Sequence, residues 1–436
     1  FRKHAFKNTE LTDLLVELEA TSGRDLRSWS KLWLETAGVN TLRSEFTVDE
    51  HGNFATFAIL QSAIAEQPTL RPHRLGVGLY DLIDGKLQRV EHIRVDIDGA
   101  KTELAELVGR KCPALVLLND EDQTYAKIRL DQDSLAVALE HLSDIEDPLT
   151  RALIHGAAWD ATRDAEWNPR DYIKLVLGNI ANETESTTMQ TLLRQLITVG
   201  RFYVKQSDRE QVLAEIAESL LALAKAAKPG SDAQLQFTKF FTQFARTASQ
   251  LDAAAALLDG SLRLEGLTID ADLKWELLTS LVVGGRAGET EIAALAKIDA
   301  TANGQKAAAQ ARAAIGDAAS KLATFKLLTE TKEYSNALVQ MASVGFTRAI
   351  DVEVLRPFAQ KYFESALMIW ETQTFKIAEY LLVNLFPMPL CDESLAALSR
   401  EWIAKPEIQA QPALARILVE NLAALERALK VQATDR

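Results

Sequence analysis

At 436 residues the chain is long enough for two to four domains of ordinary size. Its hydrophobic content of 47% and charged content of 25% are typical of a globular protein. A net charge of −13, with no basic run interleaved with aromatics, argues against nucleic-acid binding. No apolar stretch approaches the ~20 residues of a membrane span, so we expect neither nucleic acid nor a membrane as a partner. Cys112 and Cys391 lie far apart and are expected to be free thiols, which fits a reducing cytoplasm.

The first 38 residues predict two amphipathic helices. Asn8 is a candidate N-cap, and Gly23 is placed to end the first helix with a positive φ. Asp25 is the candidate cap of the second helix, which Gly38 would end. The apolar stripes are Leu11, Leu14, Leu15 and Leu18, then Leu26, Trp29 and Trp33. Because the chain opens in mid-helix without an initiator Met, we expect it to be cut from a larger protein, with these stripes partly exposed.

Residues 41–131 alternate with period two and are rich in β-branched side chains, which predicts strands. Asp84-Gly85 and Asp98-Gly99 are hairpin signals between them. The candidate strands are Thr41–Val48, Phe54–Ala63, Arg74–Ile83, Leu87–Ile97, Thr102–Leu107, Ala114–Leu118 and Ala126–Leu130. About seven short strands in some ninety residues favour a β-sandwich of Ig-like architecture, without the Cys…Trp…Cys hallmark of true Ig domains.

From Ser134 onward the hydrophobic period becomes helical, so we place a domain boundary near Asp133. Representative stripes are Leu213, Ile216, Leu220 and Leu223, and Leu418, Leu422, Leu425 and Leu429. Pro and Gly breakers separate many helices of 10–20 residues. This pattern predicts a large all-α domain of irregular HEAT-like solenoid type, with a non-repetitive helical bundle as the alternative, because no strict sequence period is present.

Motifs that carry chemistry are absent from the sequence. HExxH would place two His on one helix face for zinc, with Glu as the general base. None of the six histidines forms such a pair; they are His4, His51, His73, His92, His141 and His155. The sequence also lacks a P-loop, GxSxG, CxxC and GxGxxG. We therefore predict no catalytic residue and no metal ligand in this chain, and its substrate-binding residues are unknown.

Three weaker candidates have simpler explanations. The run Gly284–Gly288 lacks the preceding strand of a phosphate-binding loop, which favours a connection between helices. The acidic run Ser143–Asp147 lacks alternating calcium ligands, which favours a linker with helix-capping carboxylates. The aromatic group at helical spacing favours core packing over a ligand box; its members are Phe237, Phe240, Phe241 and Phe244.

Several segments, in this order, resemble the aminopeptidase N family of zinc metallopeptidases. The clearest match is Asn8–Gly38, with NTELTDLL, Ser22-Gly23 and the Leu26, Trp29, Trp33 ridge. Asn119-Asp120 followed by Tyr125–Leu130 is similar to the end of the family's sandwich. Arg151–Tyr172, with Trp159-Asp160, Arg163-Asp164 and Asp171-Tyr172, is similar to the opening of its helical domain. Many relatives have an aromatic residue and Pro where this chain has Val39-Asn40, which leaves the subfamily open.

The resemblance implies a domain order. Residues 1–38 would be the C-terminal helices of a truncated peptidase domain, 39–133 a β-sandwich domain, and 134–436 the helical C-terminal domain. The family's zinc ligands and catalytic residues match positions upstream of Phe1, so zinc is expected in the parent protein and none in this chain. The parent would remove N-terminal residues from peptides, while this part alone should be inactive.

The resemblance also implies that the helical domain caps the active site and limits peptide access, with the upstream peptidase domain as its partner. The alternative is a stand-alone HEAT-like scaffold or protein-interaction module. The reading frame upstream of Phe1 distinguishes these: HExxH with a later Glu ligand indicates the peptidase, and a nearby start codon indicates the scaffold.

Overall fold

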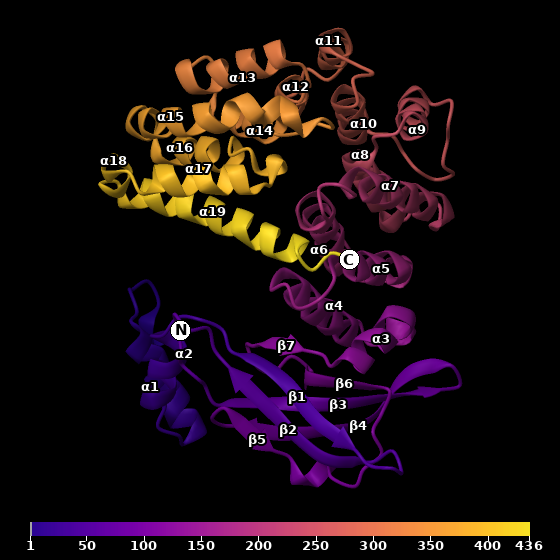
Figure 1. Cartoon of the computed structure of the whole chain (residues 1–436), viewed down its shortest axis with the longest axis vertical. Helices are drawn as coiled ribbons and strands as arrows, with labels where there is room; N and C mark the ends of the chain where they lie inside the picture. The colour runs from indigo at the N-terminus through magenta and orange to yellow at the C-terminus, as the bar shows by residue number, and fades with distance from the viewer. Residues whose placement is uncertain (1) are drawn as a thin grey trace. The chain divides into compact units, whose positions relative to one another are not determined.

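The computed structural model describes residues 2–436, which form two compact units joined in the chain between Asp160 and Ala161 (Figure 1). The first unit contains all of the strands in the described residues, and the second is wholly helical apart from its loops. A small sheet region therefore precedes a large all-helical region, in the order that the hydrophobic periods predict.

The opening segment forms a 3-10 turn η1 (Arg2–His4) and two helices, α1 (Leu11–Ser22) and α2 (Arg27–Leu34). The N-cap prediction for Asn8 was wrong by two residues: Glu10 is the N-cap, and its backbone N–H donates to Asp13 Oδ2 at 3.0 Å. Gly23 ends α1 with a φ of 70°, as predicted. The cap prediction for Asp25 was wrong: Leu26 is the N-cap of α2, and Asp25 Oδ1 accepts from the backbone N–H of Arg27 at 3.0 Å. α2 ends at Leu34, before the predicted end at Gly38.

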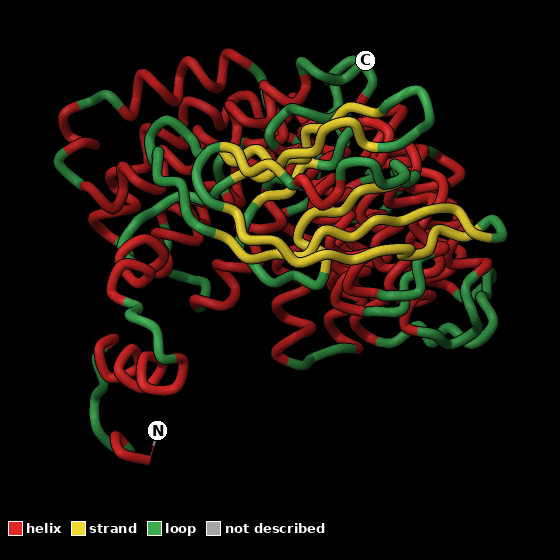
Figure 2. Tube along the Cα trace, turned by 90° about the horizontal axis from the view of Figure 1, so that it is seen from below, coloured by secondary structure: helices red, strands yellow, loops and turns green. Residues whose placement is uncertain are grey.

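Seven strands follow and form two sheets (Figure 2). One sheet has the order β5-β2-β1-β7 and the other β4-β3-β6. β1 and β7 pair in parallel, whereas the other paired strands are antiparallel. The strands are β1 (Thr41–Val48), β2 (Phe54–Ser62), β3 (His73–Ile83), β4 (Lys86–Ile97), β5 (Lys101–Glu103), β6 (Leu115–Asp120) and β7 (Lys127–Arg129).

The predicted strand Thr102–Leu107 is the largest departure within this region. Only Lys101–Glu103 is strand, and a 3-10 turn η2 (Ala105–Leu107) follows it. Leu104 and Leu107 are both buried, so their spacing of three places them on the same side. That spacing fits a 3-10 turn and not the period of two that a strand requires.

Apolar side chains from both sheets share one core. Phe54 and Phe57 of β2 lie edge to face at 5.0 Å between ring centroids, and both belong to this core with Leu75 and Val77 of β3. Gly76 and Gly78 of β3 have no room for a side chain: a Cβ would lie 2.6 Å from the Asp120 carbonyl oxygen at Gly76 and 2.4 Å from Asp120 Oδ2 at Gly78. These glycines let β6 approach closely at its carboxyl end.

The first helix after the strands begins close to the predicted change in hydrophobic period. Asp131 caps α3 (Gln132–His141) by accepting from the Ser134 N–H at 2.9 Å. A turn η3 (Leu142–Asp144) then leads to α4 (Pro148–Arg163). Val116 of β6 donates its N–H to the Ser134 hydroxyl at 2.9 Å, which ties α3 to the sheet.

The second unit contains the remaining helices. They are α5 (Pro169–Asn179), η4 (Ile180–Asn182), α6 (Ser186–Thr198), the π-helical turn η5 (Val199–Tyr203), α7 (Arg209–Ala226), α8 (Asp232–Phe244), α9 (Ala248–Asp259), α10 (Ala271–Val283), α11 (Glu289–Ile298), α12 (Ala302–Ala313), α13 (Ala318–Glu330), α14 (Asn336–Phe346), η6 (Val352–Leu355), α15 (Arg356–Thr372), α16 (Phe375–Asn384), η7 (Met388–Leu390), α17 (Glu393–Ile403), α18 (Pro406–Gln409) and α19 (Pro412–Gln432). No helix within residues 2–436 combines the length and apolar character that crossing a membrane requires.

Candidate functional site

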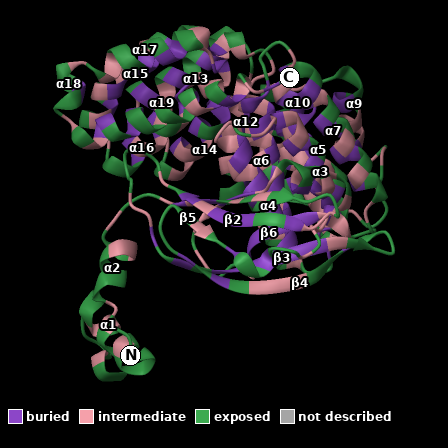
Figure 3. Ribbon diagram, turned by 60° about the horizontal axis from the view of Figure 1, so that its bottom comes forward, coloured by how far each residue is buried: buried purple, intermediate pink, exposed green. Residues whose placement is uncertain are grey.

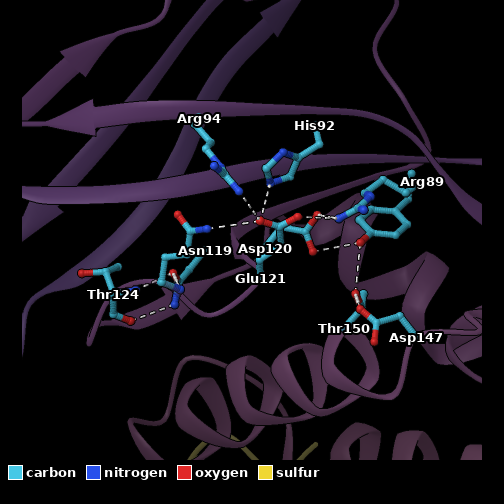
Figure 4. Close-up of polar contacts among 11 residues, drawn as sticks. Arg89, His92, Arg94, Asn119, Asp120, Glu121, Thr124, Asp147 and Thr150 are labelled. Carbon is cyan, nitrogen blue, oxygen red and sulfur yellow. Dashed lines mark hydrogen bonds and ion pairs between the residues drawn. The ribbon is translucent and has the colours of Figure 1, made fainter.

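A polar cluster lies at the carboxyl end of β6, in the first unit (Figure 4). The backbone there is unusual, since Asn119, Glu121 and Asp122 have φ values of 59°, 75° and 51°. The Asn119 side chain supports this turn: its Oδ1 accepts from the Gln123 and Thr124 N–H groups, and its Nδ2 donates to the Thr124 carbonyl at 2.9 Å. Left-handed backbone at three non-glycine residues is held only where the surroundings fix it.

Asp120 lies at the centre of this cluster, with its side chain almost fully buried. Its Oδ1 accepts from the Tyr80 hydroxyl at 2.9 Å, and its Oδ2 accepts from the Arg89 guanidinium at 3.0 Å. The Tyr80 hydroxyl also lies 3.2 Å from Thr150 Oγ1, on α4. The carboxylate therefore joins β3, β4 and, through Tyr80, the start of α4.

Glu121, the next residue, faces three basic side chains of β4. Its carboxylate lies 3.1 Å from Arg94, 3.6 Å from Arg89 and 3.8 Å from His92. The hydrogen bond from Arg94 holds the pKa of Glu121 below its usual value. Burial, with the Asp120 carboxylate nearby, raises the pKa of Tyr80. A phenol of raised pKa is a poor base or nucleophile at neutral pH.

A cavity of about 360 Å³ adjoins the cluster and is lined by Tyr80, Arg89, Glu146 and Asp147, among others. Asp147 Oδ1 accepts from the Leu149 N–H at 3.1 Å, and Oδ2 accepts from Thr150 Oγ1 at 3.0 Å. The acidic run thus supplies a capping carboxylate at the start of α4, as we interpreted it from the sequence. Both carboxylate oxygens of Asp120 already accept hydrogen bonds from protein donors. The cluster is therefore better explained as a structural contact between elements than as a reaction centre.

The histidines do not form a common site. His51 is exposed in a turn, whereas His73 of β3 is buried between Gln61 Oε1 at 3.0 Å and Thr124 Oγ1 at 2.7 Å. Burial and the Arg71 guanidinium lower the pKa of His73 to about 4. His141 pairs with Asp144 at 3.0 Å. Within residues 2–436 no three His, Cys, Asp or Glu side chains gather closely enough to hold a metal ion.

The other segments considered in the sequence have the structural roles that we favoured for them. Gly284–Gly288 connects α10 to α11 and so lies between two helices. Phe237, Phe241 and Phe244 are fully buried in α8, and Phe240 is partly buried. Cys112 and Cys391 are both free thiols.

Arg71, in the loop before β3, anchors α2 and was missed in the sequence. It is 4% exposed, and its guanidinium donates to three backbone carbonyls at the end of α2 and just beyond. The contacts are Nε to Leu32 O at 2.9 Å, and one terminal nitrogen to Thr36 O at 3.2 Å, Thr36 Oγ1 at 2.7 Å and Ala37 O at 3.0 Å. The cation also lies 5.7 Å from the Trp33 ring centroid. An arginine is the side chain that satisfies several helix-end carbonyls at once.

Several apolar side chains of the opening helices are exposed. Leu14 is 56% exposed and Trp29 is 38% exposed. Figure 3 shows α1 and α2 mostly in the exposed and intermediate colours. The large apolar side chains of α1 and α2 that are exposed are Leu11, Leu14, Val16, Leu18, Trp29 and Leu34, and we call this set of side chains the opening face. Several large apolar side chains on two short neighbouring helices mark a surface that suits a partner.

Comparison with known proteins shows what this chain is similar to. Residues 115–427 match the model of the family described as ERAP1-like C-terminal domain. Aminopeptidase N of Streptomyces lividans is 42% identical over 442 residues, covering 100% of this chain and 51% of that protein. The crystal structure of Legionella pneumophila aminopeptidase A in complex with aspartic acid superposes with a TM-score of 0.53 at 11% identity, covering 94% of this chain and 52% of that one. The chain spans about half the length of the curated relative that it matches.

Proposed function

The chain belongs to the ERAP1-like C-terminal domain family, and from this membership we propose that it is the non-catalytic C-terminal portion of a zinc aminopeptidase that removes N-terminal residues from peptides. The observation that carries the proposal is the 42% identity to an aminopeptidase N along the full chain and only half of that relative. Residues 2–436 do not offer a zinc site, so we assign the metal and the hydrolysis to a peptidase domain upstream of Phe1.

We further propose that the opening face packs on that peptidase domain. On this view residues 1–38 close the peptidase domain, 39–133 form an Ig-like β-sandwich domain, and 134–436 form a HEAT-like helical domain. The exposure of Leu14 and Trp29 supports the assignment, because burying a large apolar side chain contributes about 1.5–3 kcal/mol that the isolated chain forgoes. Hydrogen exchange tests it: residues 11–34 should be more protected in the complete protein than in this chain alone.

The helical region, in this proposal, caps the active site and limits which peptides enter. The family resemblance motivates this role, and the size of the all-helical unit is compatible with it. The protein would act in the cytoplasm, where its two free cysteines remain reduced.

The experiment begins with the reading frame upstream of Phe1, where HExxH followed by a Glu ligand is expected. The complete protein is then assayed against an aminoacyl-anilide, peptides of increasing length, and a folded protein with a free N-terminus. A capping role predicts efficient cleavage of the anilide and short peptides and no cleavage of the folded protein. Equal rates across this series would contradict the cap, and a start codon close to Phe1 would favour an independent scaffold.

A further inference from the structure

Four arginines from separate elements of the second unit line one cavity of about 330 Å³. Arg201 lies in η5, Arg209 opens α7, Arg246 lies between α8 and α9, and Arg348 follows α14. We call them the arginine pocket. Up to 147 positions of sequence separate them, so the fold and not a local motif brings them together.

The hydrogen bonds of these guanidinium groups are mostly with neutral acceptors. Arg201 donates to the Gln243 carbonyl at 2.7 Å. Arg209 donates to the Pro389 carbonyl at 3.3 Å and the Val204 carbonyl at 3.4 Å. Arg246 has an ionic partner, since it lies 2.6 Å from Glu210.

Two of the arginines keep buried donors without a partner. Arg209 is 5% exposed and Arg348 is 9% exposed, and the Nε of each has no hydrogen-bond acceptor. A buried charged donor without an acceptor costs stability, so such groups are retained where a ligand can complete them.

The acidic side chains nearby do not balance this charge. Glu210 is largely exposed and already faces Arg246. Glu276 attracts Arg348 electrostatically, but its carboxylate accepts a hydrogen bond from Gln243 Nε2 at 2.9 Å. Four guanidinium groups against two carboxylates leave an excess of positive charge, in a chain whose net charge is −13.

The electrostatics of Arg201 agree with this geometry. Burial, followed by the neighbouring guanidinium groups of Arg348 and Arg246, lowers the pKa of Arg201 to about 9. A group held in this way among like charges is stabilised when an anion enters.

A purely structural role explains only part of the arrangement. Arginines that cap helix ends account for the carbonyl contacts of Arg201 and Arg209. Capping does not account for Arg348, whose Nε has no acceptor, or for the empty volume in front of these groups. The remaining walls include Phe202, Leu213 and Ile350, so the cavity has polar and apolar sides and the size of a small-molecule site.

We propose that the arginine pocket binds a small multivalent oxyanion, either inorganic phosphate or a polycarboxylate. Planar guanidinium groups match the geometry of both, because each can donate two parallel N–H bonds to paired oxygens. The proposal concerns the helical unit alone and does not depend on the aminopeptidase assignment.

The test is isothermal titration of the full 436-residue chain with phosphate and, separately, with citrate, at constant ionic strength, together with the melting temperature under the same conditions. We expect saturable 1:1 binding of one of them and a rise in melting temperature beyond that given by sodium chloride of equal ionic strength. The anion that binds more tightly identifies the phosphate or the polycarboxylate class.

Substitutions separate a binding role from a structural one. Arg348→Met and Arg201→Met should each weaken binding by at least about tenfold, while Arg348→Met leaves the ligand-free melting temperature unchanged or raised because it removes an uncompensated buried charge. Arg416→Met, at an exposed arginine of α19, is the matched control and should bind normally. The proposal is overturned if neither anion exceeds sodium chloride, or if both pocket variants bind as the unaltered chain does.

Discussion

Replacing Arg71 by Met should release the opening helices from the sheets while leaving the rest of the first unit folded. Arg71 makes four contacts of 2.7–3.2 Å with Leu32, Thr36 and Ala37, and a longer one of 3.4 Å with Asn40 Oδ1. Methionine preserves the apolar stem of the side chain but none of its donors. The carbonyls after α2 then lose their partner.

The expected magnitude follows from those contacts. The Nε–H group and the two N–H groups of the terminal nitrogen can donate three hydrogen bonds, which at about 0.5–1.5 kcal/mol each contribute roughly 1.5–4.5 kcal/mol. Residues 36 and 37 are not buried and their carbonyls can regain water, so we expect the lower part of that range, about 1.5–3 kcal/mol. Each 1.4 kcal/mol corresponds to a tenfold change in an equilibrium constant, so amide exchange across residues 27–37 should accelerate by roughly 10- to 150-fold.

The assay is hydrogen exchange with mass-spectrometric readout on the unaltered chain and the variant. Arg74→Met is the matched control, because Arg74 lies three residues along the chain and is exposed with only an Asp96 partner at 3.3 Å. Arg71→Lys should resemble Arg71→Met, since an ammonium cannot span the same acceptors. Unchanged exchange in residues 27–37 of Arg71→Met would refute the anchoring role of this side chain.

Three further predictions concern buried polar groups. Asp120→Asn should destabilise the first unit by about 1–2 kcal/mol in urea unfolding, because the charged partner of Arg89 is lost while the acceptor for Tyr80 remains. The pKa of His73 is lowered from 6.5 to about 4. The contribution of neutral His73 to the free energy of unfolding is therefore full above pH 6.5 and is lost as the pH falls towards 4. The difference in free energy of unfolding between the unaltered chain and His73→Gln should shrink by about 2 kcal/mol over that range of pH. Lys321→Met should cost about 1–3 kcal/mol at alkaline pH, where the uncharged amine of Lys321 contacts three buried carbonyls at 2.6–3.1 Å, and less at neutral pH, where charging the buried group opposes folding.

A stability difference between the unaltered chain and His73→Gln that does not vary from pH 6.5 to 4 would contradict the lowered pKa. Burial and the Arg348 guanidinium lower the pKa of Lys321 to about 7. The contribution of Lys321 to the free energy of unfolding is therefore full above pH 10.5 and declines as the pH falls to 7. Lys326→Met, at an exposed position of the same helix, should be near neutral. An Asp120→Asn variant as stable as the unaltered chain would show that Glu121 and water are sufficient partners for the Arg89 guanidinium.

The sequence predicted the strands well because their period is reinforced by burial. Thr41–Val48 matches β1 at both ends, and Asp84-Gly85 turns the β3–β4 hairpin as predicted. The hairpin prediction at Asp98-Gly99 was wrong, because this turn joins β4 of one sheet to β5 of the other. The prediction at Thr102–Leu107 was wrong because Leu104 and Leu107 are both apolar and were assigned to a strand. Their spacing of three residues fits a 3-10 turn, but this is evident only once both side chains are known to be buried in the core.

The polar sites were not predictable by the same reasoning. Arg71 reaches carbonyls 34–39 residues away in the chain, and the arginine pocket draws on four elements with no common spacing. Arginine is normally a surface residue, so periodicity alone assigns these side chains to solvent. Their roles depend on tertiary contacts that bring separate helix ends together.

Zinc content and aminopeptidase activity, measured side by side for this chain and for the complete protein encoded by its gene, test the proposed function most directly. We predict about one tightly held zinc and hydrolysis of an aminoacyl-anilide for the complete protein, since a catalytic zinc needs three protein ligands, and neither property for this chain. One stoichiometric zinc with anilide hydrolysis in the 436-residue chain alone would contradict it.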